Sequence, residues 1–337
     1  MKVLILILLF LLEVFSIAIE PETKIKKRAL ASEEEDSFNL QDVEKDQLLK
    51  GRRDFQANKV VSFTLYTRSA PKQVIGLVDA KSLSSSNFNA SHPTRLIIHG
   101  WFNNGNFTIQ KIIQEAYHLR GDFNVFIVDW SEGALDQYAH AASRIDSVGK
   151  TVADFLIFLR KETGIRLSDV TVIGHSMGAH IAGVAGRNVA KVEELGVIIG
   201  LDPALPMFFT FFALSRLNTS DARYVETIHT NTNGLGIGPP VGTASFYPNF
   251  GKWQPACGVD FAGVCSHILA PVYFAESITS DKGFWARRCQ GYDDIINKSC
   301  KGTGEVALMG GEPSNIRSEG VYWLETNSIT PFAKGKL

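Results

Sequence analysis

This sequence of 337 residues has no excess of charge of either sign. It contains 34 lysines and arginines against 35 aspartates and glutamates, which gives a net charge of −1. The basic clusters KIKKR and KGRR both lie before residue 54. Proteins that hold nucleic acid through its phosphates need a broad basic surface, so nucleic acid is not expected as a partner.

Long apolar runs are also missing after the first 12 residues. No later segment is expected to supply the roughly 20 apolar residues of a bilayer-spanning helix. The run from Val3 to Leu12 follows Lys2 and stops before Glu13, and the small residue Ala18 lies shortly beyond it. This pattern predicts an export signal over residues 1–18, cleaved after Ala18, and a mature protein outside the cell.

Residues 19–54 lack the apolar content of a folded core. They are rich in charge, with EEED at positions 33–36. The segment is predicted to be a pro-segment or a flexible arm. The clusters 26–28 and 52–53 are candidate processing sites, although such charge runs are more often solvated tails. Residues 55–337 then form the predicted globular domain.

Cysteine is scarce, with four residues in the chain. Their spacing is too wide for a zinc knuckle, and an exported chain meets an oxidising compartment, so disulfides are expected. Three pairings are possible, and sequential pairing, which closes two short loops, is the prediction: Cys257 with Cys265, and Cys289 with Cys300. Four N-x-S/T sequons suit the same secretory route: Asn89, Asn106, Asn218 and Asn297.

The chain alternates strand-like and helix-like segments. Apolar, β-branched runs fall at 60–67, 94–100, 124–130, 170–176 and 195–202, and helix-like stretches at 108–119, 138–162 and 176–187. This alternation predicts an α/β fold with a mostly parallel sheet and helices on both faces. Ligands bind outside the carboxyl ends of such strands, where four polar residues fall: His99, Asp129, Ser176 and Asp202.

The pentapeptide GHSMG at 174–178 joins one of these strands to a helix. A tight strand-to-helix turn exposes the hydroxyl of Ser176, and Gly174 and Gly178 remove side chains that would otherwise collide. The bare pattern also fits an accidental glycine-rich turn. Its position between a strand and a helix favours a nucleophile.

A nucleophilic serine needs a base and an acid that orients the base. Asp202 ends the strand at 197–201 and is the candidate acid, although an aspartate there is often only a turn former. Two histidines follow it. His267, two residues beyond Cys265 on a loop that a disulfide would hold, is favoured as the base, and His229 at the end of a strand-like segment is the alternative.

The same chemistry needs N–H donors for the oxyanion. Met177, directly after the nucleophile, is one candidate. Trp101, which follows Gly100 after the strand at 94–98, is the other. No metal or organic cofactor is needed.

Read in chain order, LIIHGW, NVFIVDW, GHSMGAHIAG, GLDPALP, DARYVETIHTN and CSH resemble the pancreatic-lipase family of animal neutral lipases, and most of all its insect and venom phospholipase A1 branch. The resemblance covers residues 60–332. It implies the α/β-hydrolase fold, the triad Ser176, Asp202 and His267, and an oxyanion hole from the N–H groups of Trp101 and Met177. It also assigns His229 to a structural position.

Two departures from the family limit what the resemblance implies. Members with the full architecture carry a β-sandwich domain that docks colipase, and this sequence stops at Leu337, so neither a C-terminal β-sandwich domain nor colipase is expected. At the family's calcium loop a single carboxylate remains, so no tight metal site is expected; the residues there are Ala213, Arg216, Asn218 and Asp221.

The family's lid lies between Cys257 and Cys265 and here comprises the seven residues Gly258 to Val264. An isolated helix needs about 12 residues, so this lid should not form one, and the site should stay open to water. In the family, short lids resemble the phospholipase pattern. The resemblance therefore implies a monomeric phospholipase A1 that acts on the sn-1 ester at a membrane or micelle surface.

Three other functions are compatible with the same pattern. An acylglycerol lipase or a galactolipase would use the same scaffold and triad. From a different class, yolk-protein relatives keep the fold as inactive storage or binding proteins. A complete triad favours catalysis over storage.

The export signal predicts the start of the mature protein. N-terminal sequencing of the secreted protein should begin after Ala18, or further along the chain near Arg53 if the arm is removed. Secreted protein that retains Met1 would contradict this prediction.

Overall fold

The computed structural model describes residues 55–70, 72–105 and 108–336. All of them belong to one compact unit, Leu48–Leu337. The predicted export signal at 1–18, the predicted arm at 19–54 and the sequon asparagine Asn106 lie outside the described residues. They stay predictions.

The strands of the described ranges form one 11-stranded sheet in the order β10-β9-β11-β8-β7-β6-β5-β3-β4-β1-β2. Seven central strands run parallel to one another, and antiparallel strands extend both edges of the sheet; the seven are β4, β3, β5, β6, β7, β8 and β11. The predicted mostly parallel sheet is confirmed. The strands are β1 (Ser62–Tyr66), β2 (Gln73–Ile75), β3 (Thr94–Ile98), β4 (Asn124–Asp129), β5 (Thr171–His175), β6 (Val197–Leu201), β7 (Tyr224–Ile228), β8 (Ala244–Pro248), β9 (Phe284–Arg288), β10 (Val306–Met309) and β11 (Gly320–Leu324).

Both faces of the sheet are buried, because alternate side chains of a strand point to opposite faces. In β3, Leu96 and Ile98 belong to one hydrophobic cluster and Ile97 to another, and in β5 Val172 and Ile173 divide in the same way. The sequences of these strands therefore do not alternate between apolar and polar residues.

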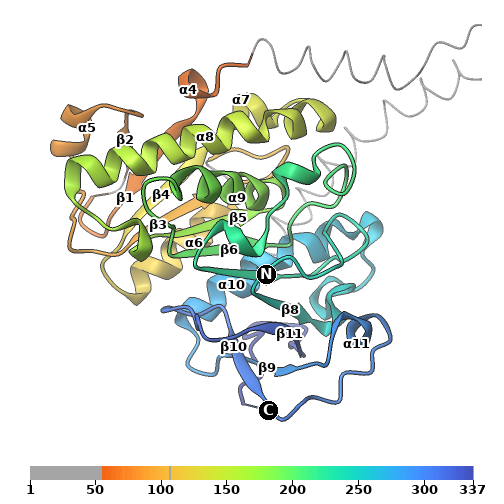
Figure 1. The fold of residues 1–337 in the computed structure, drawn as a ribbon. Helices are drawn as coiled ribbons and strands as arrows, with labels where there is room; N and C mark the ends of the chain where they lie inside the picture. The colour runs from red at the N-terminus through yellow and green to blue at the C-terminus, as the bar shows by residue number, and fades with distance from the viewer. Residues whose placement is uncertain (1–54, 71, 106–107, 337) are drawn as a thin grey trace, which may run out of the picture. The chain divides into compact units, whose positions relative to one another are not determined.

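Helices cover both faces, as predicted. One cluster includes α8 (Tyr138–Thr163) and α9 (Met177–Val189), and the other includes α6 (Thr108–Arg120) and α10 (Val264–Thr279). Figure 1 shows α8 and α9 lying together across the strands. The shorter helices are α4 (Ala57–Val60), α5 (Ala80–Ser84), α7 (Ser131–Ala134) and α11 (Tyr292–Ile296).

The packing of α8 on α9 depends on a small residue in α8. A Cβ at Gly149 would lie 2.5 Å from the Cβ of Val184 in α9, so only glycine allows the two helices to approach this closely. At its far end α8 stops where Gly164 adopts a left-handed φ of 74° and donates its N–H to the Arg160 carbonyl.

The prediction about apolar segments needs one correction. The stretch Phe261–Thr279, which contains α10, has the length and composition of a membrane span. In the structure 61% of that stretch is buried, and α10 packs against α6 in the cluster that covers one face of the sheet. Its apolar character is thus explained by burial on two sides.

Both predicted disulfides are confirmed. Cys257 and Cys265 are joined with Cα atoms 5.8 Å apart, and Cys289 and Cys300 with Cα atoms 5.2 Å apart. The first closes the loop in front of α10, and the second encloses α11. Asp294 lies close to the second pair, but bonded sulfurs are not thiolates and do not form a zinc site with it.

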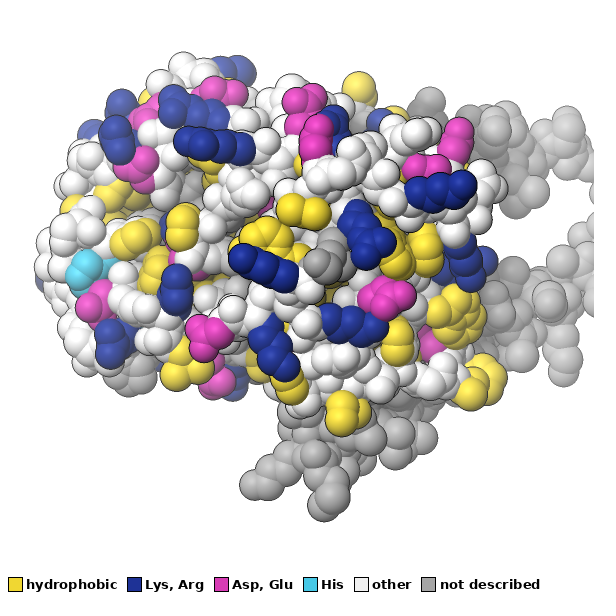
Figure 2. Space-filling model, turned by 90° about the horizontal axis from the view of Figure 1, so that it is seen from below, with side chains coloured by type: hydrophobic (Ala, Val, Ile, Leu, Met, Phe, Trp, Pro, Cys, Tyr) yellow, Lys and Arg dark blue, Asp and Glu magenta, His cyan; other side chains and the backbone are white. Residues whose placement is uncertain are grey.

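Charges of both signs are mixed on the surface. Figure 2 shows one face on which basic and acidic side chains lie among each other. Exposed ion pairs such as Arg288 with Glu305 and Lys334 with Glu325, each at 2.7 Å, link opposite charges. On the face shown, basic groups are thus accompanied by acidic ones, in keeping with the net charge of −1.

Candidate active site

Ser176 occupies the turn between β5 and α9. Its φ of 57° and ψ of −122° lie outside the regions that L residues ordinarily adopt. A Cβ at Gly174 would overlap the backbone of Gly178, and a Cβ at Gly178 would overlap the carbonyl of Ile98. The steric reason predicted for both glycines is therefore confirmed.

Ser176 is more enclosed than the turn alone predicts. Its relative exposure is only 9%. The loop after β3 lies directly against it, because a Cβ on Gly100 would be 2.8 Å from the Cβ of Ser176. A neighbouring backbone thus covers part of the turn, which the pentapeptide by itself did not predict, and the expected exposure of the hydroxyl stays a prediction.

Asp202 directly follows β6 and is fully buried. Its Oδ1 accepts hydrogen bonds from the N–H groups of Thr230 at 2.7 Å and Asn231 at 3.0 Å, which belong to the loop after β7. Its Oδ2 lies 2.6 Å from Nδ1 of His267. A buried carboxylate needs such donors, because an unpaired charge would cost several kcal/mol.

His267 lies in the first turn of α10, and its prediction as a loop residue is wrong. The segment from Val264 is apolar and helical, and Asp260 caps it by accepting the N–H groups of Cys265 at 3.1 Å and Ser266 at 2.8 Å. The disulfide at Cys265 adds a covalent restraint two positions before His267. A capped helix start therefore holds the ring, which is a firmer support than the predicted loop.

His175 connects the serine turn to His267. The two imidazole rings have centroids 4.6 Å apart, and Nε2–H of His175 donates to the His267 carbonyl at 3.1 Å. Burial, followed by the nearby His267, lowers the pKa of His175 well below its ordinary value. His175 therefore stays neutral and adds no positive charge beside His267.

These contacts bring the predicted nucleophile, acid and base to one edge of the sheet. Among the described residues the Ser176 hydroxyl has no hydrogen-bond partner. The hydrogen bond between a nucleophile and its base is often long without substrate and shortens in the reactive complex. The structure thus shows the contact between acid and base, and the catalytic roles stay predictions.

The predicted oxyanion donors flank the serine. Met177 is the first residue of α9, where backbone N–H groups have no partner inside the helix. Trp101 follows Gly100, and no acceptor from the described ranges binds its backbone N–H. Both groups are therefore available to an oxyanion, and their role also stays a prediction.

His229, the alternative base, has other partners. It is fully buried, donates Nδ1–H to the Ile237 carbonyl at 2.9 Å, and lies 2.8 Å from the Thr227 hydroxyl through Nε2. Its ring stacks on Tyr247 at 4.5 Å. Both ring nitrogens are thus occupied in the core.

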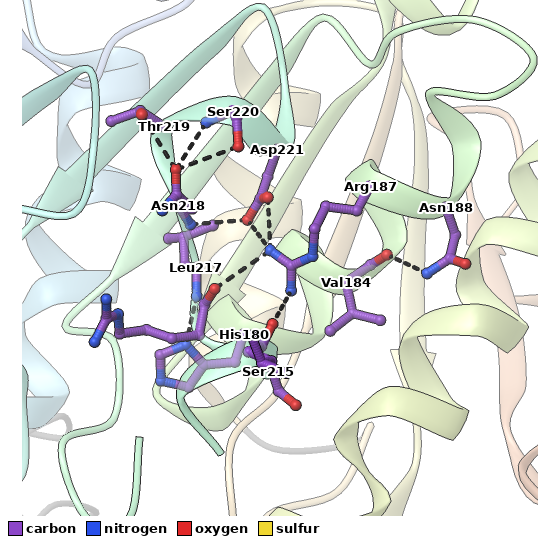
Figure 3. Close-up of polar contacts among 12 residues, drawn as sticks. His180, Val184, Arg187, Asn188, Ser215, Leu217, Asn218, Thr219, Ser220 and Asp221 are labelled. Carbon is purple, nitrogen blue, oxygen red and sulfur yellow. Dashed lines mark hydrogen bonds and ion pairs between the residues drawn. The ribbon is translucent and has the colours of Figure 1, made fainter. Parts of the chain in front are cut away.

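The loop compared with the family's calcium site is held by an arginine of α9. Figure 3 shows Arg187 pointing at Asp221, with Nη1 2.6 Å from both carboxylate oxygens. The guanidinium also donates to the carbonyls of Leu214 at 3.2 Å and Arg216 at 3.3 Å. Burial raises the pKa of Asp221, and the charge of Arg187 opposes that rise.

The other residues predicted at this loop do not converge on a common point. The side chain of Asn218 accepts hydrogen bonds from Thr219 and Ser220 and caps a short turn. Ala213 has no ligand atom in its side chain, and Arg216 lies over the ring of Phe209 at 4.4 Å. The expectation that no metal binds here stays a prediction.

His180 was not identified from the sequence. It is fully buried in α9, donates Nε2–H to the Ala204 carbonyl at 2.8 Å and accepts the Leu217 N–H at 3.1 Å through Nδ1. Burial lowers its pKa to about 3, so the ring stays neutral. His180 and Arg187 are seven positions apart in α9, so they lie on one face of the helix. Two polar residues with this spacing in a mostly apolar helix are a signal that the sequence contains.

A family model described as Lipase matches residues 25–332 of this chain. The pancreatic triacylglycerol lipase of Cavia porcellus is 34% identical over 275 residues, which are 74% of this chain and 59% of that protein. The pancreatic lipase-related protein 2 of Cavia porcellus is 34% identical over 247 residues, which are 71% of this chain and 56% of that protein. The chain thus spans between 56% and 59% of the length of these relatives.

Among solved structures, an alpha/beta hydrolase enzyme from a Medee basin deep-sea metagenome library is similar at 18% identity. The match covers 52% of this chain and 66% of that chain with a TM-score of 0.32. An overlap of this size has no bearing on the activity of this chain.

The Arg187–Asp221 pair predicts a measurable stability effect. Arg187→Gln should lower the free energy of unfolding by about 2 kcal/mol, because it leaves the buried Asp221 without a cation; the loss is smaller than for a fully buried pair since Arg187 is partly exposed. Arg160→Gln breaks the more exposed pair with Glu193 and should cost less than about 1 kcal/mol. Denaturant unfolding measures both variants, and equal losses would contradict the prediction.

Proposed function

The chain belongs to the lipase family, and on this premise we propose that it is a secreted serine hydrolase of lipid carboxylic esters. The observation that carries the proposal is the 2.6 Å contact between Asp202 and His267 beside the Ser176 turn. Hydrolysis through an acyl-enzyme needs a nucleophile, a base and an orienting acid, and these three residues supply them.

The tautomer of His267 follows from its partner. Asp202 Oδ2 can only accept, so Nδ1 of His267 carries the proton and Nε2 is left as the basic nitrogen. Nε2 would take the proton of the Ser176 hydroxyl as Oγ attacks the ester carbonyl. Asp202 would stabilise the imidazolium that forms.

The leaving alcohol and the acyl group would then be released with the help of the same residues. The imidazolium would protonate the leaving alcohol, and the acyl group would stay on Ser176 until His267 activates a water molecule. In both halves of the reaction the N–H groups of Trp101 and Met177 would stabilise the oxyanion. The proposed mechanism uses no metal or organic cofactor.

The loop between the disulfide-bonded cysteines bears on the substrate. A 3₁₀ turn at Pro255–Cys257 leads into this loop, which continues through Gly258 at a positive φ of 59° and contains a second 3₁₀ turn at Phe261–Gly263. Val259 and Phe261 are 79% and 72% exposed, so they do not form the buried face of a covering helix. We propose that this short lid admits a polar head group and that the substrate is the sn-1 ester of a phospholipid at a membrane or micelle surface.

A triacylglycerol or other acylglycerol substrate is the second candidate. The names of the two relatives from Cavia porcellus favour it, since one is a triacylglycerol lipase and the other a related protein. A galactolipid would also carry a polar head group past a short lid. An inactive storage role is disfavoured because the contact between Asp202 and His267 is intact.

The proposed secretion has support from the surface. Asn89, Asn218 and Asn297, three of the four sequon asparagines, are exposed. Two disulfides fit an oxidising compartment. As proposed, the protein acts as a monomer, without colipase and without nucleic acid.

The triad predicts a sharp loss of activity. Ser176→Ala should reduce kcat for a soluble short-chain ester by at least about 10⁴-fold, and His267→Ala nearly as much, because triad members act as a unit. A fluorophosphonate probe should label wild-type protein at Ser176. Absence of labelling in folded wild-type protein would refute the proposed enzyme.

His229→Ala is the control for the choice of base. It removes an imidazole that is even more buried than that of His267, but it should leave most of the activity per folded molecule. Activity lost in His229→Ala and kept in His267→Ala would reverse the assignment. Circular dichroism establishes that each variant is folded.

The lid predicts the outcome of a substrate panel. Phospholipid, galactolipid and triacylglycerol with position-labelled acyl chains should show release of the sn-1 acyl chain from phospholipid and little turnover of long-chain triacylglycerol. The rate should not rise sharply above the solubility limit, because the lid has no closed helix to displace. Strong triacylglycerol hydrolysis with such a rise would favour the second candidate and leave the triad unaffected.

A further inference from the structure

The predicted mechanism does not use His99, a fully buried histidine next to the oxyanion loop. It directly follows β3 and precedes Gly100 and Trp101. Its ring stacks on the buried Trp130 with centroids 5.5 Å apart. The Trp130 indole N–H also donates to the backbone carbonyl of His99 at 2.9 Å. Both the ring and the backbone of His99 are thereby held in place.

The partners of the ring show which of its nitrogens donates to the loop after β3. Nδ1 lies 2.9 Å from the Gly100 carbonyl, which can only accept, so Nδ1 carries a proton. The backbone N–H of Trp130 donates to Nε2 at 3.1 Å, so Nε2 is an acceptor. Asp129 Oδ1, 3.3 Å from Nε2, accepts the Ser131 N–H at 2.9 Å. His99 thus donates its Nδ1–H to the Gly100 carbonyl, and its Nε2 faces Trp130 and Asp129.

This bond fixes the orientation of the next peptide group. In a trans peptide the C=O of one residue and the N–H of the following residue point in opposite directions. A Gly100 carbonyl held on the His99 ring therefore directs the Trp101 N–H away from that ring. Glycine is the residue whose peptide rotates most freely, so this position needs an external restraint.

The restrained peptide lies against the nucleophile. A Cβ on Gly100 would be 2.8 Å from Cβ and 3.4 Å from Oγ of Ser176. Beyond it the loop is fixed by the Trp101 indole N–H, which donates to the Asp136 carbonyl at 2.8 Å, and by the Phe102 N–H, which donates to the Ala134 carbonyl at 3.1 Å. Among the described residues, the Trp101 backbone N–H has no acceptor.

We propose that His99 is a positioning residue for oxyanion stabilisation: through the Gly100 carbonyl, its Nδ1–H directs the Trp101 N–H at the acyl oxygen bound to Ser176. The proposal rests on the proposed ester hydrolysis. His99 touches neither substrate nor the reacting atoms. Its contribution should therefore fall on kcat, because an oxyanion donor acts in the transition state and hardly in the ground state.

Three variants separate positioning from stability. His99→Leu removes both ring contacts and should lower kcat for a soluble short-chain ester by about 100-fold, the loss typical of one missing oxyanion donor, with little change in KM. His99→Gln can still accept the Trp130 N–H but has no donor at the Nδ1 position, and it should lose as much kcat. His99→Asn keeps a donor at the Nδ1 position and should retain most of the wild-type kcat, although it leaves the Trp130 N–H unpaired.

The matched control is Asn124→Leu, at the opposite end of the strand that precedes Trp130. Asn124 is also fully buried and bonds the backbone of Asn89 and His92. Its loss should lower thermal stability and leave kcat unchanged. This control shows what destabilisation alone does to the rate.

Affinity for a trifluoromethyl ketone, which forms an oxyanion on serine, gives an independent readout. It should fall in His99→Leu and His99→Gln in proportion to kcat/KM, and it should persist in His99→Asn. A kcat that follows thermal stability across all variants, or equal activity of His99→Gln and His99→Asn, would overturn the proposal. Wild-type protein that hydrolyses no ester would overturn the proposed function itself, whereas active wild-type with unaffected His99→Leu would overturn only the positioning role.

Discussion

The close approach of two backbones at the carboxyl edge of the sheet is the constraint on which the site depends. Gly178 at the start of α9 packs on the Ile98 carbonyl at the end of β3, and Gly100 packs on Ser176. No side chain fits between these segments. The left-handed Ser176, the first N–H groups of α9 and the loop after β3 therefore share one small space. Close packing on both faces of the sheet keeps this arrangement rigid.

A second requirement is the compensation of one buried charge. The carboxylate of Asp202 has no exposure and is bonded by two backbone N–H groups of the loop after β7 and by His267 of α10. Three segments must meet for the charge to be tolerated, because an unpaired buried carboxylate is costly. The same contacts that make the fold possible thus orient the proposed base. The capped and disulfide-linked start of α10 fixes the ring from its own side.

Helix α9 links the proposed nucleophile to the loop that follows the acid. Its first turn begins at Ser176, and farther along the helix His180 bonds Ala204 and Leu217 while Arg187 bonds Asp221. The loop after Asp202 therefore rests on the helix that begins at the serine. Buried histidines with backbone partners thus support the loop after β3, the proposed base and the loop after the proposed acid; they are His99, His175 and His180. The site is held mainly by short hydrogen bonds to main-chain atoms.

Features with a local signal could be predicted from the amino-acid sequence. Apolar runs and glycines predicted the parallel sheet, the helices and the turn at Ser176, and cysteine spacing predicted both disulfides, because each depends on neighbouring residues. The predicted loop position of His267 is wrong, because the apolar segment from Val264 forms α10 directly after the disulfide-bonded loop. The contacts between distant side chains became known only from the folded chain: Asp202 and His267 are 65 positions apart, and Arg187 and Asp221 are 34 apart. Contacts between residues so far apart produce no periodic pattern in the sequence, because their segments come together only when the sheet has folded.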